Sequence, residues 1–307
     1  MKLAVPDKIS PSYFVAEAAV ELGFFKDEGL DVSLELVYPV DKAYAALRDG
    51  AIDFVGGAAH AVPSAFPGFS GAKLIAAQAQ GMYWFLVMRA DLGARRGELG
   101  IVKGRTIGAA PWVNTGLRGL LLAAGIDPER DKVNIAPVPG VLDSVPNFGV
   151  MAAKALEAGK LDGFWANGMG AEVAVRGGYG TVVADVRRGD GPKACFNYTA
   201  PTIATTDALI ARSPETVAAA VRAIVRTQAA LKADVARAGA VGRSLFPPAE
   251  AELIVALIRR DLPFYDASLS RDFIAGMTAF LRAQGILDGD APYERIVAAR
   301  YAPLWKG

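Results

Sequence analysis

Hydrophobic and polar positions follow two periods in the first third of the chain, one with a repeat of about two residues and one with a helical repeat. The short apolar stretches favour strands, and the amphipathic stretches between them favour helices. The pattern predicts strands at 3–6, 32–36 and 54–55 and helices at 11–22 and 41–48. Gly23 is expected to end the first helix, and Asp41 is expected to cap the second at its N-terminus. This order predicts a β-α-β-α-β unit.

The same pattern occurs a second time about 100 residues later. It predicts strands at 106–109, 133–135 and 163–165 and helices at 115–124 and 149–158. The end of each unit is marked by a similar stretch, ALRDGAID at 46–53 and ALEAGKLD at 155–162. In both copies a glycine suited to the left-handed C′ position precedes an apolar residue and an aspartate. The chain is therefore expected to contain a weak internal repeat of one α/β unit.

Two α/β lobes follow from this repeat. Crossover helices make the strands parallel, and ligands of such sheets bind beyond the carboxyl ends of the strands. The stretches 73–89, strand-like at 82–88, and 194–206 are extended in character and are predicted to cross between the lobes. After Ser213 the apolar positions have a helical period, and these helices are expected to return to the first lobe. The predicted boundaries are 1–86 with 197–307 for lobe I, and 87–196 for lobe II.

Composition agrees with a packed protein of this size. Of 307 residues, 52% are hydrophobic and 21% charged, and the net charge is +1. A nucleic-acid partner is not expected, because binding nucleic acid requires clustered, unneutralised Lys and Arg. No run reaches the roughly 20 apolar residues of a membrane helix. Cys195 is the single cysteine, so no intramolecular disulfide is possible and no second thiol is available for a zinc site.

The opening of the chain resembles a known family of binding proteins. SYFVAE at 12–17 and LGFFKDEGLDV at 22–32 are similar to the opening of the nitrate/sulfonate/taurine and thiamine-precursor group of ABC-transporter substrate-binding proteins. The repeated stretches at 47–53 and 156–162 fit the same group. The resemblance implies a type II periplasmic-binding-protein fold, in which two α/β lobes are joined by two crossing segments. It also implies delivery of a solute to the membrane permease of an ATP-driven importer.

Four loops at the predicted strand ends supply candidate ligand-binding residues. In the second loop, small residues would expose backbone N–H groups, and His60 is a ligand contact, a helix cap or a packed or surface side chain. In the third, Asn114 or Thr115 would cap a helix whose free N–H groups suit an anionic or carbonyl group. The candidates in the four loops are Ser10 and Tyr13; Gly57, Ala58 and His60; Trp112, Asn114 and Thr115; and Trp165 and Asn167.

The two crossing segments add Trp84 and the weaker candidate Tyr198. Three of the four tryptophans thus fall in predicted cleft segments, which favours an aromatic ligand held by stacking. No Arg or Lys lies in a cleft loop, so a multiply charged anion is not favoured. The expected ligand is a small aromatic or heteroaromatic solute, carboxylate or pyrimidine-like, and an alkanesulfonate or taurine-like anion is the alternative.

A transport receptor that closes on its ligand is the expected function, without catalytic residues, cofactor or metal. The first alternative is a pyrimidine-synthase-like enzyme of the thiamine-precursor branch, which uses pyridoxal phosphate. The Cys-rich motif of those enzymes is absent, and no cleft lysine suits a Schiff base. A ligand-sensing regulator would need a helix-turn-helix extension. The expected protein is a monomer. Because 2–5 reads as a strand with no apolar h-region before it, either the protein is cytosolic or a leader was replaced by Met1, and the resemblance favours the periplasm.

Overall fold

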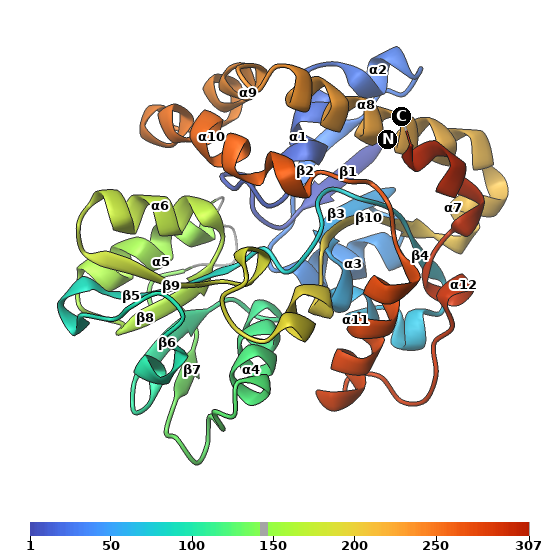
Figure 1. The fold of residues 1–307 in the computed structure, drawn as a ribbon. Coiled ribbons are helices and arrows are strands. Elements are labelled where there is room, and N and C mark those ends of the chain that lie inside the picture. Colours follow the sequence, from blue (N-terminus) through green and yellow to red (C-terminus); the bar gives the residue numbers. More distant parts are fainter. Residues whose placement is uncertain (142–146, 307) are drawn as a thin grey trace.

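Two five-stranded sheets organise the computed structural model, which describes residues 1–141 and 147–306 (Figure 1). Both sheets have the same internal plan, with three parallel strands followed by a strand antiparallel to both of its neighbours. Across the first sheet the order is β2 (Ser33–Leu36), β1 (Lys2–Val5), β3 (Phe54–Ala58), β10 (Pro201–Thr206) and β4 (Ala72–Ala77). Across the second it is β7 (Asn134–Ala136), β6 (Thr106–Ala109), β8 (Gly163–Ala166), β5 (Phe85–Arg89) and β9 (Gly180–Asp185).

The fourth strand of each sheet is the one that enters from the other lobe. β5 joins the second sheet directly after the crossing 78–84, and β10 joins the first sheet after the return crossing 186–200. The predicted parallel β-α-β-α-β units are confirmed as β1 to β3 and β6 to β8. The predicted lobe boundary between residues 86 and 87 falls inside β5, two residues after that strand begins.

Helices cover both faces of each sheet. α5 and α6 pack on one face of the second sheet and α4 on the other, as Figure 1 shows. The helices of the N-terminal half are α1 (Phe14–Glu21), α2 (Phe24–Asp27), α3 (Val40–Arg48), α4 (Val113–Ala123), α5 (Phe148–Glu157) and α6 (Gly168–Arg176). Those of the C-terminal half are α7 (Asp207–Arg212), α8 (Pro214–Ala233), α9 (Arg237–Leu245), α10 (Pro248–Asp261), α11 (Arg271–Ala283) and α12 (Tyr293–Ile296).

The repeated aspartate has the same role in both lobes. The Asp53 carboxylate accepts a hydrogen bond of 2.8 Å from the backbone N–H of Lys2, and Asp162 accepts one of 2.9 Å from Thr106. Each aspartate thereby fixes the start of the first strand of its unit. Gly50 and Gly159, with φ of 74° and 67°, occupy the left-handed conformation that the repeat predicted.

Three local predictions are wrong. Helix α3 begins at Val40 with Pro39 as its N-cap, so Asp41 lies inside the first turn instead of capping it. Of the stretch 194–206, predicted to be extended, only β10 is a strand, and the first part of the stretch forms a 3-10 helix, η6 (Lys193–Tyr198). The C-terminal helices do not pack on the first lobe alone, because α10 also contacts α6 and α11 also contacts η6. These contacts hold the two lobes together on the side of the crossings.

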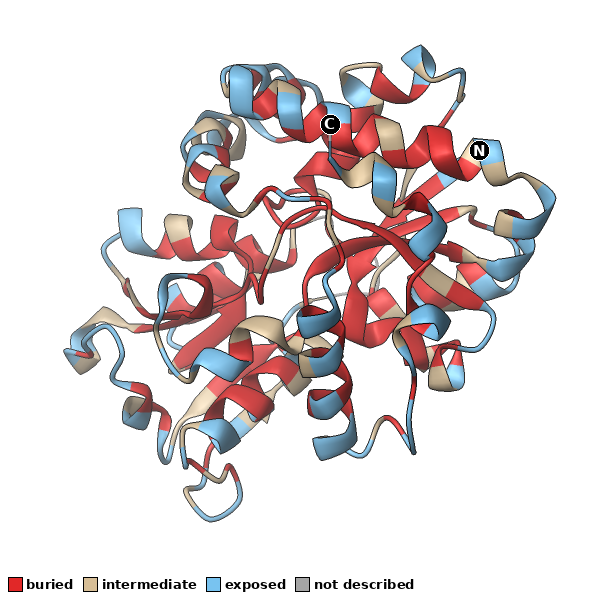
Figure 2. Cartoon of the chain, turned by 45° about the vertical axis from the view of Figure 1, so that its right-hand side comes forward, coloured by how far each residue is buried: buried red, intermediate tan, exposed pale blue. Residues whose placement is uncertain are grey.

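Buried residues make up most of the central strands of both sheets (Figure 2). One hydrophobic cluster runs without a break from the first lobe through the crossing at Met82, Tyr83 and Trp84 to the α4 face of the second sheet. A separate, smaller cluster fills the α5 and α6 face around Phe164 and Phe148. The lobes therefore share a continuous apolar connection along the crossing segments.

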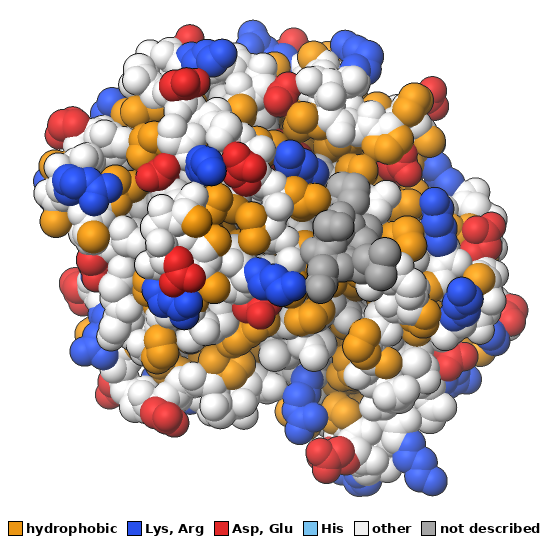
Figure 3. Space-filling model, turned by 180° about the vertical axis from the view of Figure 1, so that it is seen from behind, with side chains coloured by type: hydrophobic (Ala, Val, Ile, Leu, Met, Phe, Trp, Pro, Cys, Tyr) orange, Lys and Arg blue, Asp and Glu red, His pale blue; other side chains and the backbone are white. Residues whose placement is uncertain are grey.

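The surface carries charges of both signs. On the face seen in Figure 3, Lys and Arg side chains are interspersed with Asp and Glu and do not gather into a patch of one sign. Within the described ranges, no helix has the length and apolarity needed to cross a membrane.

Candidate functional site

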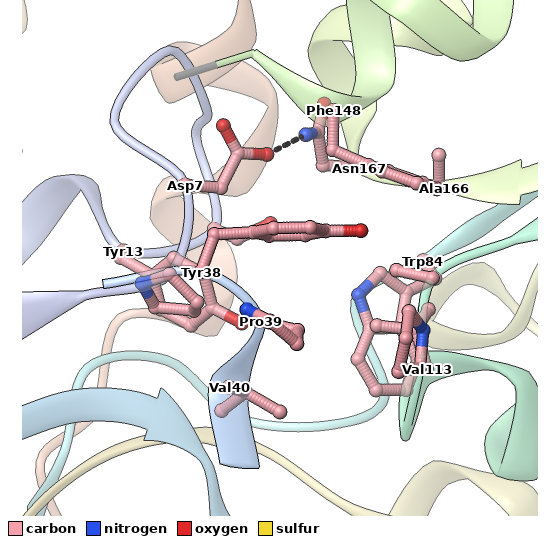
Figure 4. A pocket seen from close by; sticks show the side chains of 14 residues that line it. Asp7, Tyr13, Tyr38, Pro39, Val40, Trp84, Val113, Phe148, Ala166 and Asn167 are labelled. Atoms are coloured by element: carbon pink, nitrogen blue, oxygen red, sulfur yellow. Dashed lines mark hydrogen bonds between the residues drawn. The ribbon is translucent and has the colours of Figure 1, made fainter. Parts of the chain in front are cut away.

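A cavity lies between the lobes where the carboxyl ends of several strands meet. Pro6 and Asp7 follow β1, Pro39 follows β2, Ala110 follows β6 and Asn167 follows β8, as expected for a ligand site of parallel sheets. Trp84, from the first crossing, closes one side (Figure 4). The cavity is lined by Pro6, Asp7, Ser12, Tyr13, Tyr38, Pro39, Val40, Trp84, Ala110, Pro111, Val113, Phe148, Ala166 and Asn167.

The cavity is small because the lobes touch across it. Its volume is about 40 Å³, whereas an apolar cavity that accepts benzene measures about 150 Å³. Tyr38 of the first lobe stacks on Phe148 of the second, with ring centroids 6.2 Å apart and an interplanar angle of 22°. An aromatic solute can therefore enter only if the lobes move apart or the wall side chains shift.

Asp7 contributes a carboxyl group to the described cavity wall, and it bridges the lobes. Its Oδ2 accepts a hydrogen bond of 2.5 Å from Nδ2 of Asn167, as Figure 4 shows. Its Oδ1 is buried and has no hydrogen-bond partner among the described residues. Burial raises the pKa of Asp7 to about 8, against the smaller lowering effect of the hydrogen bonds from Asn167 and the Ile9 backbone. The neutral acid is therefore the favoured form of Asp7 in this state at neutral pH.

Asn167 is held by the start of its own helix. Its Oδ1 accepts from the backbone N–H groups of Met169 and Gly170, at 2.9 and 3.2 Å, and thereby caps α6. Gly149 of α5 leaves the room for this side chain, since a Cβ atom at that position would collide with the Asn167 amide. The cap leaves Nδ2 to donate toward Asp7.

Aromatic rings form the rest of the wall and the layer behind it. The Tyr13 and Tyr83 hydroxyls are hydrogen-bonded at 2.9 Å. Trp84 has Tyr83 on one side, with ring centroids 4.7 Å apart, and Trp165 behind it at 6.2 Å. The indole N–H of Trp165 is buried and has no partner among the described residues. Trp165 therefore supports Trp84 and does not itself face the cavity.

His60 joins three parts of the molecule beside this aromatic group. It lies in the 3-10 helix η1 (Ala59–Ser64), and its Nε2 is 2.9 Å from the Trp112 carbonyl oxygen and 3.1 Å from Oγ1 of Thr115. A carbonyl only accepts, so Nε2 carries the proton and Nδ1 accepts from Oγ1 of Thr199, 3.0 Å away. Burial lowers the pKa of His60 to about 4. The neutral ring thus links the first lobe to α4 of the second.

Trp112 supplies this contact from a strained backbone. Its φ of 66° is rare for a residue with a side chain, and it turns the chain directly into α4. The predicted caps Asn114 and Thr115 are therefore wrong, because the helix begins at Val113 with Trp112 as its N-cap. Asn114 is exposed, and the Thr115 hydroxyl bonds the Trp112 carbonyl at 2.5 Å.

Three of the twelve predicted site residues, Tyr13, Trp84 and Asn167, line the cavity, and the other nine are not part of its lining. Ser10 is buried and accepts from the backbone N–H of Ser12. Gly57 and Ala58 are not in a loop, because β3 continues through them and pairs with β10. Tyr198 stacks on Phe280 outside the cavity, with centroids 4.4 Å apart. The other five predicted residues that do not line the cavity are those described in the preceding paragraphs, namely His60, Trp112, Asn114, Thr115 and Trp165.

Sequence reasoning missed the residue that contributes the carboxyl group. Asp7 lies between a strand and the first named loop, in a position where an aspartate is expected to be solvated. Tyr38 and Pro39 were missed because the loop after β2 was not considered. Phe148 was missed because it precedes the predicted start of its helix. A consistent search of the residues after every parallel strand would have found Asp7 and Pro39.

Neither a metal centre nor a reactive thiol is evident in the described part of the chain. No group of three or more His, Cys, Asp or Glu side chains there could hold a metal ion. Cys195 is buried, and burial raises the pKa of its thiol to about 11, so little thiolate is present at neutral pH.

Comparisons with known proteins agree on the fold. A family model described as NMT1/THI5-like matches residues 11–238. A protein from Bordetella bronchiseptica RB50 has a similar structure, with a TM-score of 0.77 and 22% identity, covering 98% of this chain and 95% of that one. The alkanesulfonate-binding protein SsuA from Xanthomonas axonopodis pv. citri, bound to MOPS, has a TM-score of 0.69 and 16% identity, covering 98% and 97%.

An enzyme has the same architecture. The desulfurization enzyme DSZB, of which a mutant was solved with biphenyl-2-sulfinic acid, has a TM-score of 0.65 and 16% identity, covering 98% of this chain and 97% of that one. The search of curated proteins gave no match. At these identities the likeness establishes a two-lobed binding-protein fold and leaves the ligand open.

Proposed function

The chain belongs to the NMT1/THI5-like family, and we propose that it is the solute-binding receptor of an ATP-driven importer. It captures a small aromatic or heteroaromatic solute in the cavity between its lobes. The observation that carries this proposal is the cavity itself, which combines aromatic walls with a few polar groups at the carboxyl ends of the strands of both lobes. Lobe closure around the solute shifts an equilibrium between open and closed forms.

The lining supports an aromatic solute over a sulfonate. Trp84, Tyr38 and Phe148 give flat surfaces for a ring. None of the described lining residues is Lys, Arg or His, so a sulfonate would have no cationic partner there. Asp7 adds a carboxyl group whose ionised form would repel an anion. The taurine-like alternative therefore has less support than it had from the sequence.

The residues of the cavity wall also support the function of a receptor more than that of an enzyme. The enzyme alternative needs a lysine for pyridoxal phosphate or a thiolate nucleophile. The described cavity wall contains no lysine, and Cys195 is a buried thiol with a raised pKa. The partners that we propose are the solute and the permease of an importer, and we propose a periplasmic location and a monomeric receptor. Nucleic acid is not among the proposed partners.

The receptor function is tested by measuring the melting temperature of the protein in the presence of single compounds. The panel contains aromatic acids, aromatic amines, pyrimidines, sulfonates, taurine and nitrate. A solute at 100 times its Kd stabilises the folded protein by about 2.7 kcal/mol. A domain of 150–250 residues gains roughly 2–4 °C per kcal/mol, so we expect a rise of several degrees with an aromatic compound. A rise with taurine or nitrate alone would overturn the aromatic assignment. Pyridoxal phosphate absorbance in the purified protein would instead support the enzyme.

A further inference from the structure

Two buried oxygen atoms on the cavity wall lack partners, and they lie in neighbouring parts of one loop. Oδ1 of Asp7 and Oγ of Ser12 are both buried and have no hydrogen-bond partner among the described residues. Leaving a buried polar atom unpaired costs about 1–3 kcal/mol, so such atoms in a ligand cavity indicate the groups that meet the ligand.

The other polar groups of the wall have their hydrogen bonds within the protein. The Tyr13 hydroxyl pairs with Tyr83. The Asn167 side chain accepts from two backbone N–H groups and donates to Asp7. The unused capacity is therefore that of the Asp7 carboxyl oxygen and the Ser12 hydroxyl. A cationic N–H group beside Asp7 favours loss of the Asp7 proton, and the resulting carboxylate and the Ser12 oxygen can then both accept hydrogen bonds from that group.

The absence of a cationic side chain beside Asp7 on the described wall also favours a ligand with positively charged N–H groups. Asp7 is 7% exposed and has no cationic side chain beside it on the described wall. Burying a carboxylate without a partner is costly, whereas a donor of positive charge at hydrogen-bond distance offsets that cost. An anionic ligand would keep Asp7 in its neutral form and would find no cationic side chain on the described wall to offset its own charge.

We propose that the solute carries an amine or amidine group on its aromatic part, and that this group binds the Asp7 carboxyl while the ring lies against Trp84. The inference rests on the proposed function and narrows its ligand to aromatic compounds with N–H donors. It makes Asp7 the residue that selects against aromatic carboxylates and sulfonates. Ser12 accepts a second hydrogen bond from the same group.

Benzamidine and benzoate test this selection, because they have the same ring and planar substituents of similar shape but opposite charge. Calorimetric titration of the whole protein is expected to show binding of benzamidine and at least tenfold weaker binding of benzoate. Asp7→Asn is expected to weaken benzamidine binding about 10- to 100-fold, as loss of a charged hydrogen-bond partner does. Asp49→Asn, which removes an exposed carboxylate outside the cavity, is the control and is expected to leave both affinities unchanged.

Ser12→Ala provides a second variant if Asp7→Asn does not fold. It is expected to weaken the binding of benzamidine and to leave the binding of benzoate unchanged. Tighter binding of benzoate, or equal binding of both probes with no effect of Asp7→Asn, would overturn the inference and leave an aromatic receptor standing. Failure of both probes together with a thermal shift by taurine or nitrate would overturn the proposed aromatic ligand as well.

Discussion

Replacing Asp261 with alanine is expected to lower the free energy of unfolding by about 3–5 kcal/mol, because it leaves a buried arginine without its partner. Asp261 ends α10 of the first lobe, and Arg187 lies in the 3-10 helix η5 (Val186–Arg188) directly after β9 of the second. Their ion pair is 2.9 Å long, and the side chains are only 2% and 4% exposed. The Arg187 guanidinium also lies 4.7 Å from the centroid of the Phe264 ring. This ion pair therefore links the two lobes beside the return crossing 186–200.

Urea unfolding of the single variant measures this loss, and a double variant is its control. Arg187→Met combined with Asp261→Leu removes both charges and keeps apolar volume, so it is expected to recover much of the stability. Asp49→Asn, at an exposed pair with Arg48, is expected to change stability by less than about 1 kcal/mol. A loss below about 1 kcal/mol for Asp261→Ala would show that this pair does not hold the lobes.

Asp7 is expected to make the protein less stable as pH rises. Its pKa is about 8 in the folded protein and 3.8 in the unfolded chain, so the folded state keeps a proton that the unfolded state loses between these values. The stabilising contribution is complete below about pH 4 and is lost as pH rises to about 8, with a slope approaching 1.4 kcal/mol per pH unit. Asp7→Asn keeps the shape of the neutral acid and removes the titration.

Melting temperatures of wild type and Asp7→Asn at about pH 5, 6, 7 and 8 test this slope. The wild type is expected to lose stability relative to the variant across the series. Burial also raises the pKa of Glu17 and lowers that of His60, but both groups are present in both proteins, so the difference reports Asp7. Parallel pH profiles would mean that Asp7 is already ionised in the folded protein.

The fold could be predicted because the sequence features that specify it act locally and occur once in each lobe. Each aspartate of the repeat bonds the first strand of its unit, so Asp53 and Asp162 occur at the same place in both copies. Gly50 and Gly159 mark helix ends through a conformation that other residues rarely adopt. The antiparallel insertion of β5 and β10 was not predictable in the same way, since it depends on contacts between segments far apart in the sequence, such as Phe85 with Ala166 and Pro201 with Ala58.

The site was predicted less well because its chemistry depends on the approach of the two lobes. Asp7 and Asn167 are 160 positions apart in sequence, and only the folded chain brings them within hydrogen-bond distance. Trp165 was chosen because tryptophan at a strand end suits a ligand edge, but the strand directs its ring to the side where Trp84 packs. For His60 the sequence left open a ligand contact, a helix cap or a packed side chain, and in the structure it is a buried side chain whose Nε2 donates to the Trp112 carbonyl across the lobes.

Fluorine NMR of the protein labelled with 5-fluorotryptophan tests most directly whether the solute binds between the lobes. The chain has four tryptophans, of which Trp84 lines the cavity and Trp305 donates to the Ile75 carbonyl outside it. On addition of the panel compound with the largest thermal shift, the Trp84 signal, assigned with Trp84→Phe, is expected to move most and the Trp305 signal to stay. An unchanged Trp84 signal at saturation, or a shift confined to Trp305, would contradict binding in this cavity.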